Sequence, residues 1–467
     1  MQRNSLSNGV TCVALLVMAA SGCSHAAPPA KPAALESRAL DSPTLDSRIV
    51  ALVAAISQDR LVATLRKLEA FGTRHTLSAT DSPTHGIGAA RQWIFDELTH
   101  DSPKLQVSFD TYRVAKQTGM ARDVELRNVM AILPGRSARR IYISGHYDTI
   151  VLVPGPNGSM VAGERKEPGS GLPENTPAPG VNDDGSGTAL TMELARIFSQ
   201  SGIDFDATLV FMCHVAEEEG LFGARLHAQK AAAEHIPIEA VFNNDIVGGD
   251  TSGNGKVDGG TIRVYSDGPE DSPSRELARF VERWAARYVP AHRVRLMARQ
   301  DRFQRGGDHS AYNQAGFPAV GFRESRENFS RQHDPRDTFE GVAPAYLTQN
   351  ARVNAAAAAT LALAPPPPVV TDAKGLPTIT RRPSGYDANL TWKASPGAVA
   401  YRIFSREAWG MDWQHEQLLG NVTNIVLPDV QIDDEVFGVA AVDAAGHESY
   451  VSAWVAPPRV YPPVRTF

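Results

Sequence analysis

The chain has 467 residues, more than one ordinary domain requires and enough for two or three. Charged residues make up 21% and hydrophobic residues 42%, the composition of a globular protein. The net charge of -6 excludes the basic character of a nucleic-acid-binding protein, so no nucleic-acid partner is expected.

Residues 1–23 predict an export signal that ends in a lipobox. A short polar start is followed by an apolar run, Val10–Ala20, which is too short to span a bilayer. Ala20-Ser-Gly-Cys23 resembles a bacterial lipoprotein box, in which Cys23 carries the lipid. Ordinary signal cleavage is the alternative. We expect a lipoprotein of the periplasm or outer membrane, attached only through Cys23, or a secreted protein.

A tether rich in Ala and Pro, residues 24–44, precedes the predicted main domain, residues 45–364. Apolar residues recur at helical spacing over Ile49–Leu68 and Gly86–Leu98, with a loop at Gly72–His75 between them. Strand-like runs then alternate with helical segments, a pattern that predicts a mostly parallel sheet covered by helices. The strands are expected at 128–135, 140–145, 207–216, 239–246, 261–265 and 318–322, and the helices at 186–198, 273–288 and 344–363.

Two features of this domain stand apart from the alternating pattern. The Gly- and Pro-rich stretch Pro154–Pro179 predicts a long surface loop, and loops of this length are often functional lids. Cys213 lies in an apolar run and is expected to be a buried core thiol. Because Cys12 lies within the signal and Cys23 is the lipid site, no intramolecular disulfide is expected in the mature protein.

The composition changes at Pro365–Pro368, where four prolines begin a predicted linker, residues 365–378. Short strand-like runs separated by turns follow over residues 379–467 and favour a small β-sandwich. The placement of Trp392, Tyr401 and the segment Phe437–Ser449 resembles a fibronectin type III domain.

Five separated segments carry imidazole and carboxylate side chains of the kind that bind zinc. They are Ser-Gly-His146-Tyr-Asp148, Val-Asn-Asp183-Asp184-Gly, Ala-Glu217-Glu218-Glu219-Gly, Asn-Asn-Asp245 and Gln-His333-Asp-Pro. His146 follows a predicted strand, and ligands in open α/β sheets bind at the carboxyl ends of strands. Two neighbouring zinc ions need a shared carboxylate, terminal ligands on each side and a further carboxylate that acts as base.

Each segment alone also fits a structural role. His146 and Asp148 suit a polar turn, Asp183 and Asp184 suit helix capping, and Asp245 suits a loop cap. The three glutamates also fit a solvated acidic turn, and a single loop histidine such as His333 is usually solvated. Three adjacent carboxylates at a buried strand end repel one another, however, and a divalent cation nearby removes that conflict.

Together the five segments resemble metallopeptidase family 28, the co-catalytic di-zinc exopeptidases, over about residues 49–363. The resemblance implies a three-layer α/β/α zinc exopeptidase fold with a mostly parallel mixed sheet and a cofactor of two Zn²⁺ ions. It also implies that a hydroxide shared by the zinc ions attacks the scissile carbonyl of a peptide. The implied ligands are His146 and Asp245 for one zinc, Glu218 and His333 for the other, and Asp183 between them. Glu217 would be the general base and Asp148 would orient His146, while Asp184 and Glu219 would not be ligands.

The resemblance favours an aminopeptidase, and it leaves a carboxypeptidase, a glutaminyl cyclase and a non-catalytic binding protein as alternatives. Binding proteins of this fold usually lack ligands or the base, and both are present here. Many relatives carry a tyrosine before the final histidine, where it can stabilise the oxyanion. Gln332 occupies that position in this chain, so the resemblance names no oxyanion donor.

Overall fold

The computed structural model describes residues 45–152, 174–303, 305–381 and 384–456. The predicted export signal, Cys23, the tether and most of the predicted lid, Pro154–Pro179, lie outside these residues. Within the described ranges, no helix combines the length and the apolar character that crossing a bilayer requires.

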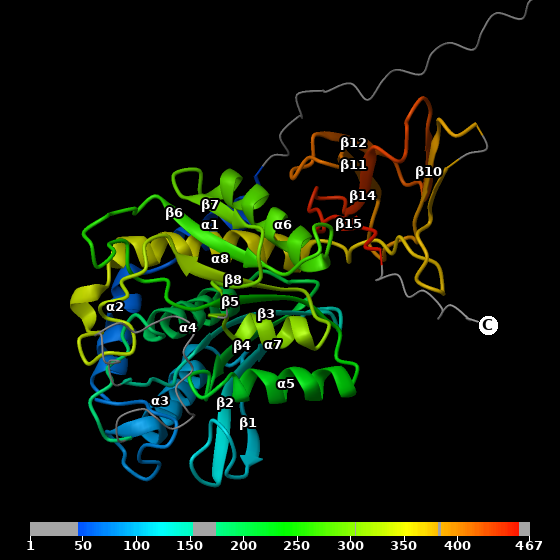
Figure 1. Cartoon of the computed structure of the whole chain (residues 1–467). Coiled ribbons are helices and arrows are strands. Elements are labelled where there is room, and N and C mark those ends of the chain that lie inside the picture. The colour runs from blue at the N-terminus through cyan, green and yellow to red at the C-terminus, as the bar shows by residue number, and fades with distance from the viewer. Residues whose placement is uncertain (1–44, 153–173, 304, 382–383, 457–467) are drawn as a thin grey trace, which may run out of the picture. The chain divides into compact units, whose positions relative to one another are not determined.

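The part of the chain before the Pro-rich linker is built on a mixed sheet of eight strands in the order β1-β2-β4-β3-β5-β8-β6-β7 (Figure 1). The four central strands, β4, β3, β5 and β8, are parallel to one another, whereas β1, β2 and β6 pair antiparallel with their inner neighbours. The predicted mostly parallel sheet is therefore confirmed for its centre. The strands are β1 (Gln106–Val114), β2 (Val124–Leu133), β3 (Arg140–His146), β4 (Thr208–His214), β5 (Ile238–Asn244), β6 (Thr261–Ser266), β7 (Arg293–Met297) and β8 (Ala319–Glu324).

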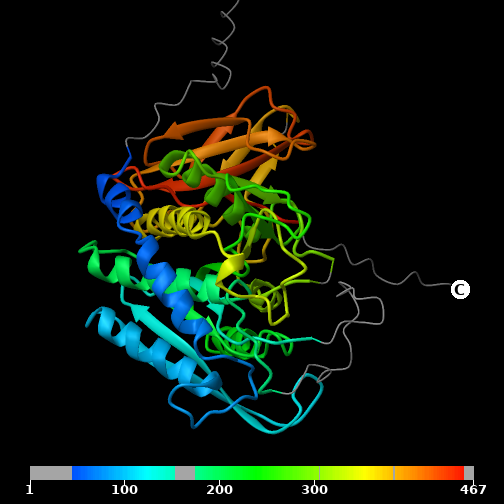
Figure 2. The ribbon, with the colours of Figure 1, turned by 90° about the vertical axis from the view of Figure 1, so that its left-hand side faces the viewer.

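Helices cover both faces of this sheet and complete the predicted three-layer fold (Figure 2). Ile141 and Ile143 of β3 belong to the core shared with α4 and α8, whereas Tyr142 packs into a separate core with α5 and α7. This alternation follows from the two-residue period of a strand. The helices are α1 (Ser47–Ala54), α2 (Gln58–Glu69), α3 (Gly86–Asp101), α4 (Gly185–Gln200), α5 (Phe222–Ala233), α6 (Pro273–Tyr288), α7 (Asp308–Gln314) and α8 (Pro344–Leu363).

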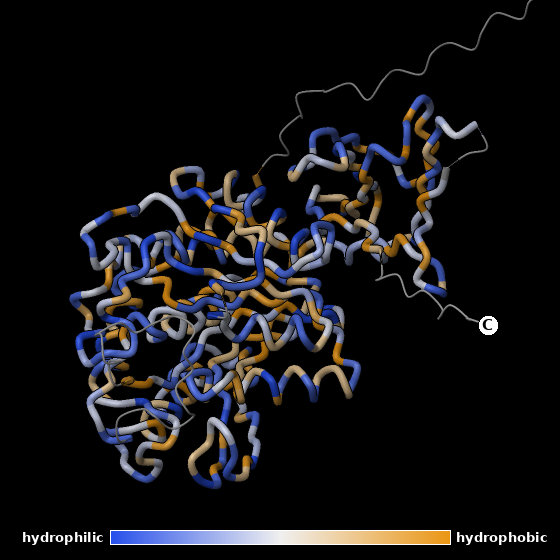
Figure 3. Tube along the Cα trace, viewed as in Figure 1, coloured by the Kyte–Doolittle hydropathy of each residue, from blue (hydrophilic) through white to orange (hydrophobic). Residues whose placement is uncertain are grey.

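The hydropathy of the chain follows this layering. Hydrophobic stretches run along the central strands, and hydrophilic stretches lie in the surrounding loops (Figure 3). The Ala-rich α8 is buried along most of its length, because small side chains let it pack closely against α4 and α6. Cys213 of β4 is fully buried in the apolar core and is a free thiol, as predicted.

The C-terminal region forms two antiparallel sheets, β13-β10-β9 and β12-β11-β14-β15. The strands are β9 (Ile379–Arg381), β10 (Ala388–Thr391), β11 (Ala400–Glu407), β12 (His415–Leu419), β13 (Asn424–Leu427), β14 (Glu435–Val442) and β15 (Ser452–Ala453). Trp392 and Tyr401 are both buried, with ring centroids 5.5 Å apart. The predicted sandwich sheets are therefore present, and the fibronectin type III resemblance stays a prediction.

Polar contacts join these C-terminal sheets to α6. The Trp413 indole N–H donates to a Glu276 carboxylate oxygen at 2.9 Å, and Arg283 pairs with Glu416 at 2.7 Å. Glu276 is fully buried, so its contact with Trp413 satisfies a group that would otherwise be costly to desolvate.

Candidate metal centre

The carboxyl ends of three adjacent parallel strands bring the first predicted residues together. β3 lies between β4 and β5, so all three strands end at the same edge of the sheet. His146 is the last residue of β3, Glu217 and Glu218 follow the end of β4, and Asp245 follows β5. Residues that are far apart in the sequence therefore lie close together, at the edge where open α/β sheets bind ligands.

The two aspartates before α4 have different surroundings. Asp184 caps the helix by accepting from the Gly187 N–H at 3.0 Å, and it accepts from the His146 N–H at 2.9 Å. Asp183 instead faces two imidazoles, with its oxygens 3.5 Å from His146 Nε2 and 3.1 Å from His333 Nε2. Capping therefore explains Asp184, and it does not explain Asp183.

The five predicted ligands converge. One set of ligand atoms within 4.8 Å of one another comes from His146, Glu217 and Asp245, and a second comes from His146, Asp183 and Glu218. His333 joins the second set, because its Nε2 lies 2.9 Å from Glu218 Oε2. Ligand atoms around a tetrahedral zinc lie roughly 3.3 Å apart, so these spacings suit zinc.

Unsatisfied polar atoms in the cluster also fit a metal. His146 Nε2 and Glu218 Oε1 are buried and have no hydrogen-bond partner. Burial and repulsion from Asp183 raise the pKa of Glu218 above its usual value, although His333 opposes the shift. A divalent cation at this position would satisfy both atoms and relieve the repulsion, and imidazole nitrogen with carboxylate oxygen is a donor set that zinc accepts.

Glu217 belongs to the first of these sets, and its carboxylate lies 3.9 Å from His146 Nε2. Burial raises its pKa well above the usual value, and the charges of Asp245 and Glu218 act in the same direction against the opposing effect of His146. A buried carboxylate at this position is placed to accept and return a proton.

Asp148 connects His146 to the acidic segment. The nearer acceptor for His146 Nδ1 is the Asp148 carbonyl oxygen, at 3.2 Å, while the carboxylate lies at 3.6 Å. When Nδ1–H donates to this carbonyl, Nε2 carries no proton and is free to bind a metal. The carboxylate accepts instead from the Glu217 and Glu218 backbone N–H groups, each at 3.2 Å. Asp148 therefore orients both the imidazole and the segment that carries the glutamates.

Sequence reasoning missed Arg323 at this site. Its guanidinium forms a bidentate ion pair with the Asp245 carboxylate, and both side chains are buried. This pairing lowers the pKa of Asp245 despite its burial, which keeps the carboxylate charged. Nothing in the β8 sequence marks Arg323, because an arginine at a strand end is usually solvent-exposed.

Gln332, which precedes His333, is bonded to neighbours outside the set of proposed ligands. Its Oε1 accepts from Arg305 at 2.6 Å, and its Nε2 donates to Glu327 at 3.0 Å. These contacts anchor the residue next to His333.

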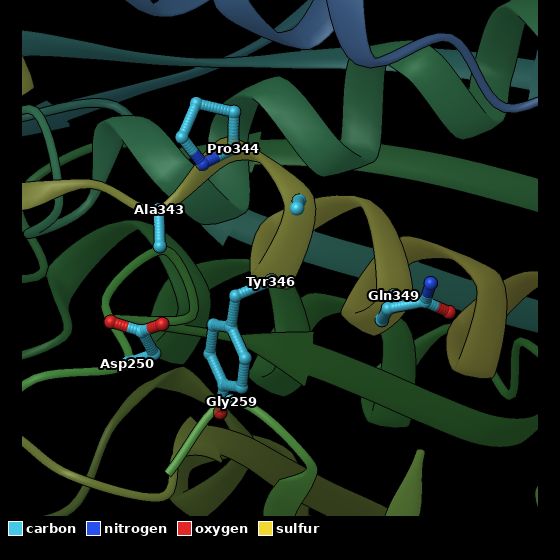
Figure 4. A pocket seen from close by; sticks show the side chains of 7 residues that line it. Asp250, Gly259, Ala343, Pro344, Tyr346 and Gln349 are labelled. Carbon is cyan, nitrogen blue, oxygen red and sulfur yellow. The ribbon is translucent and has the colours of Figure 1, made fainter. Parts of the chain in front are cut away.

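A separate surface pocket of about 350 Å³ has no cluster of reactive or metal-binding side chains among the described residues of its lining (Figure 4). Its lining is Asp250, Gly259, Ala343, Pro344, Ala345, Tyr346 and Gln349. The Tyr346 hydroxyl is already bonded, donating to the Thr261 carbonyl and accepting from the Ser325 N–H. The candidate functional site is therefore the metal cluster, which with its covered parallel sheet defines a metal-dependent hydrolase.

Comparisons with known proteins agree with this class. Residues 128–358 match the model of peptidase family M28. A probable zinc metalloprotease of Pyricularia oryzae is 33% identical over 445 residues, which cover 86% of this chain and 84% of the relative. A probable zinc metalloprotease of Pyrenophora teres f. teres is 33% identical over 456 residues, covering 89% and 87%. The chain belongs to peptidase family M28, a family of zinc metallopeptidases.

Solved structures support the fold. The LapA aminopeptidase of Legionella pneumophila is similar with a TM-score of 0.51 and 20% identity, covering 69% of this chain and 77% of LapA. LapB of the same organism gives a TM-score of 0.51 and 19% identity, covering 68% and 75%. At these identities the likeness concerns the fold alone.

Proposed function

We propose that this protein is a two-zinc exopeptidase that removes N-terminal residues from peptides. The observation that carries the proposal is the position of Asp183 between the imidazoles of His146 and His333, 3.5 and 3.1 Å from their Nε2 atoms. A carboxylate placed between two imidazoles can contact two metal ions at once.

The ligand assignment follows from the neighbours of each imidazole. His146 and Asp245 would hold the first zinc, since their atoms lie 3.8 Å apart. Glu218 and His333 would hold the second, since theirs lie 2.9 Å apart. Asp183 would bridge the two ions.

When bound, zinc would lower the pKa of water and polarise the scissile carbonyl. The chain's own contribution is proton transfer and orientation. Glu217 takes a proton from the attacking water and passes it to the nitrogen of the leaving amine as the C–N bond breaks. Asp148 holds the Glu217 backbone in place through the N–H contact at 3.2 Å.

An aminopeptidase is the leading form of this proposal because the five ligand segments resemble the co-catalytic exopeptidases, and LapA, which shares the fold, is an aminopeptidase. Carboxypeptidase and glutaminyl cyclase activity are the alternatives on the same site. A panel of peptides with one blocked end separates the three activities.

The test uses chromogenic aminoacyl substrates together with N-acetylated and C-amidated peptides, each with and without a zinc chelator. We expect cleavage of substrates with a free amino group, no cleavage of N-acetylated ones, and loss of activity with chelator that added zinc restores. Cleavage that requires a free carboxyl group would establish a carboxypeptidase. Cyclisation of N-terminal glutamine without hydrolysis would establish a cyclase. Activity that survives complete zinc removal contradicts the proposal.

A further inference from the structure

Arg74, in the loop between α2 and α3, is a fully buried cation that contacts backbone carbonyls. Its Nε donates to the Tyr147 carbonyl at 2.7 Å. Its Nη1 donates to the carbonyls of Pro179 at 2.6 Å and Leu68 at 3.2 Å, and its Nη2 donates to that of Gly180 at 2.8 Å. The guanidinium thus joins three segments of the chain that lie far apart in sequence.

Two of these segments carry proposed metal ligands. Tyr147 lies between His146 and Asp148, and Pro179 and Gly180 shortly precede Asp183. The planar fork of an arginine holds five donors in fixed directions on three nitrogens, whereas the three donors of a lysine all lie on one freely rotating nitrogen. Arg74 therefore links the backbone beside His146 to the backbone that leads to Asp183.

Further contacts tie the same two segments together at Thr149. Its hydroxyl accepts from the Arg74 N–H at 3.0 Å and donates to the Ala178 carbonyl at 2.9 Å. Gly180 has a φ of +47°, and a Cβ there would lie 2.2 Å from Thr149 Cγ2. The two segments can therefore approach this closely only because residue 180 is a glycine.

The free-energy cost of burying the Arg74 charge indicates that this side chain positions the backbone. Burial lowers the pKa of Arg74 to about 10, although Asp337 and Asp148 oppose the shift, so the side chain is charged at neutral pH. Burying a charge is expensive even when its donors are satisfied, and an apolar side chain would stabilise a loop contact at lower cost. What the guanidinium provides, and an apolar side chain does not, is a fixed distance between carbonyls.

We propose that Arg74 is a positioning residue that sets the spacing between His146 and Asp183 before metal binds. The proposal rests on the two-zinc site proposed above. The guanidinium contacts only backbone carbonyls and none of the proposed ligand atoms. Arg74 therefore acts through the backbone of the two segments.

The test compares Arg74→Lys with Arg406→Lys. Arg406 is a matched control, because it is also buried and donates to a backbone carbonyl, that of Gly410 at 2.5 Å, but it lies in the C-terminal sheets. Zinc dissociation constants are measured by chelator competition. We expect Arg74→Lys to bind zinc roughly 10–100-fold more weakly, the effect typical of residues that support metal ligands, and Arg406→Lys to bind as the wild type does. In the cobalt-substituted protein, Arg74→Lys shifts the visible absorption band, and kcat falls more than KM rises.

Amide hydrogen exchange of the metal-free protein gives a readout that does not depend on zinc. The Thr149 N–H donates to the Arg74 carbonyl at 3.2 Å, and the Gly185 N–H donates to the Gly180 carbonyl at 3.0 Å. Arg74→Lys is expected to speed exchange at both amides, while Arg406→Lys leaves them unchanged.

Zinc affinity within twofold of wild type together with unchanged exchange at Thr149 and Gly185 overturns the inference. If Arg74→Lys does not fold, Arg74→Gln decides, because its amide keeps a donor for the carbonyls and removes the charged fork. Unchanged zinc affinity and exchange in Arg74→Gln then overturns the inference. A wild-type protein that binds no zinc would refute the proposed function, while the exchange comparison would still decide the role of Arg74.

Discussion

Replacing Glu217 with glutamine lowers kcat by roughly 10²–10⁴-fold and leaves zinc binding intact. The amide keeps the size of the side chain but cannot accept the proton of the attacking water. The Glu217 carboxylate lies 3.9 Å from His146 Nε2, close enough to reach a water at the metal cluster. The measurement is steady-state kinetics with an aminoacyl substrate, together with zinc content per chain.

The neighbouring Glu218 is the matched comparison for this prediction. Its Oε2 lies 2.9 Å from His333 Nε2, so both atoms can reach the same ion. Glu218→Gln is therefore expected to lose zinc as well as activity. Glu217→Gln with activity equal to that of the wild type refutes the assignment of the base.

Replacing Asp183 with asparagine is expected to remove at least one zinc ion per chain and to abolish activity. Asp183 is the only one of the proposed ligands that is placed to bind both ions, since its two oxygens face His146 and His333 separately. An amide offers one neutral oxygen, so it cannot bridge. Metal analysis after dialysis against buffer with limited zinc measures the loss.

Asp184 provides the control for this change, because it is adjacent in sequence but bonded to backbone. It accepts from the N–H groups of His146, Gly187 and Ile246. Asp184→Asn is expected to cost about 1–3 kcal/mol of stability, the effect of disturbing buried hydrogen bonds, and to retain zinc. Equal zinc content in Asp183→Asn and Asp184→Asn contradicts the proposed bridge.

The convergence of these carboxylates and imidazoles was predictable because several of the residues follow the carboxyl ends of apolar strands. An apolar run that ends in a carboxylate or imidazole indicates a buried strand. It also indicates the edge of the sheet where the strands' carboxyl ends lie and where ligands bind. The helices α6 (Pro273–Tyr288) and α8 (Pro344–Leu363) were placed with their exact bounds, since each begins with a proline at its first turn. Ser272 also caps α6 by accepting from the Arg275 N–H.

Four elements of the catalytic domain carried too weak a local pattern to be predicted. The antiparallel edge strand β1 is half-exposed, and α5 is rich in alanine without a marked apolar face. β7 and α7 are short, at 5 and 7 residues. Their formation depends on pairing and packing with distant parts of the chain, which a local window does not contain.

The supporting residues of the site were missed for a related reason. Arg74 and Arg323 are hydrophilic by type, and sequence alone places such residues at the surface. Their roles arise only when the fold brings them to distant partners, the Tyr147 and Gly180 carbonyls for Arg74 and the Asp245 carboxylate for Arg323.

The most direct test of the central claim is a crystal structure of the zinc-loaded protein with anomalous data collected on both sides of the zinc absorption edge. The account predicts two anomalous peaks, about 3.5–4 Å apart, bounded by the proposed ligands. These are His146, Asp183, Glu218, Asp245 and His333. A single peak, or peaks away from these five side chains, would contradict it.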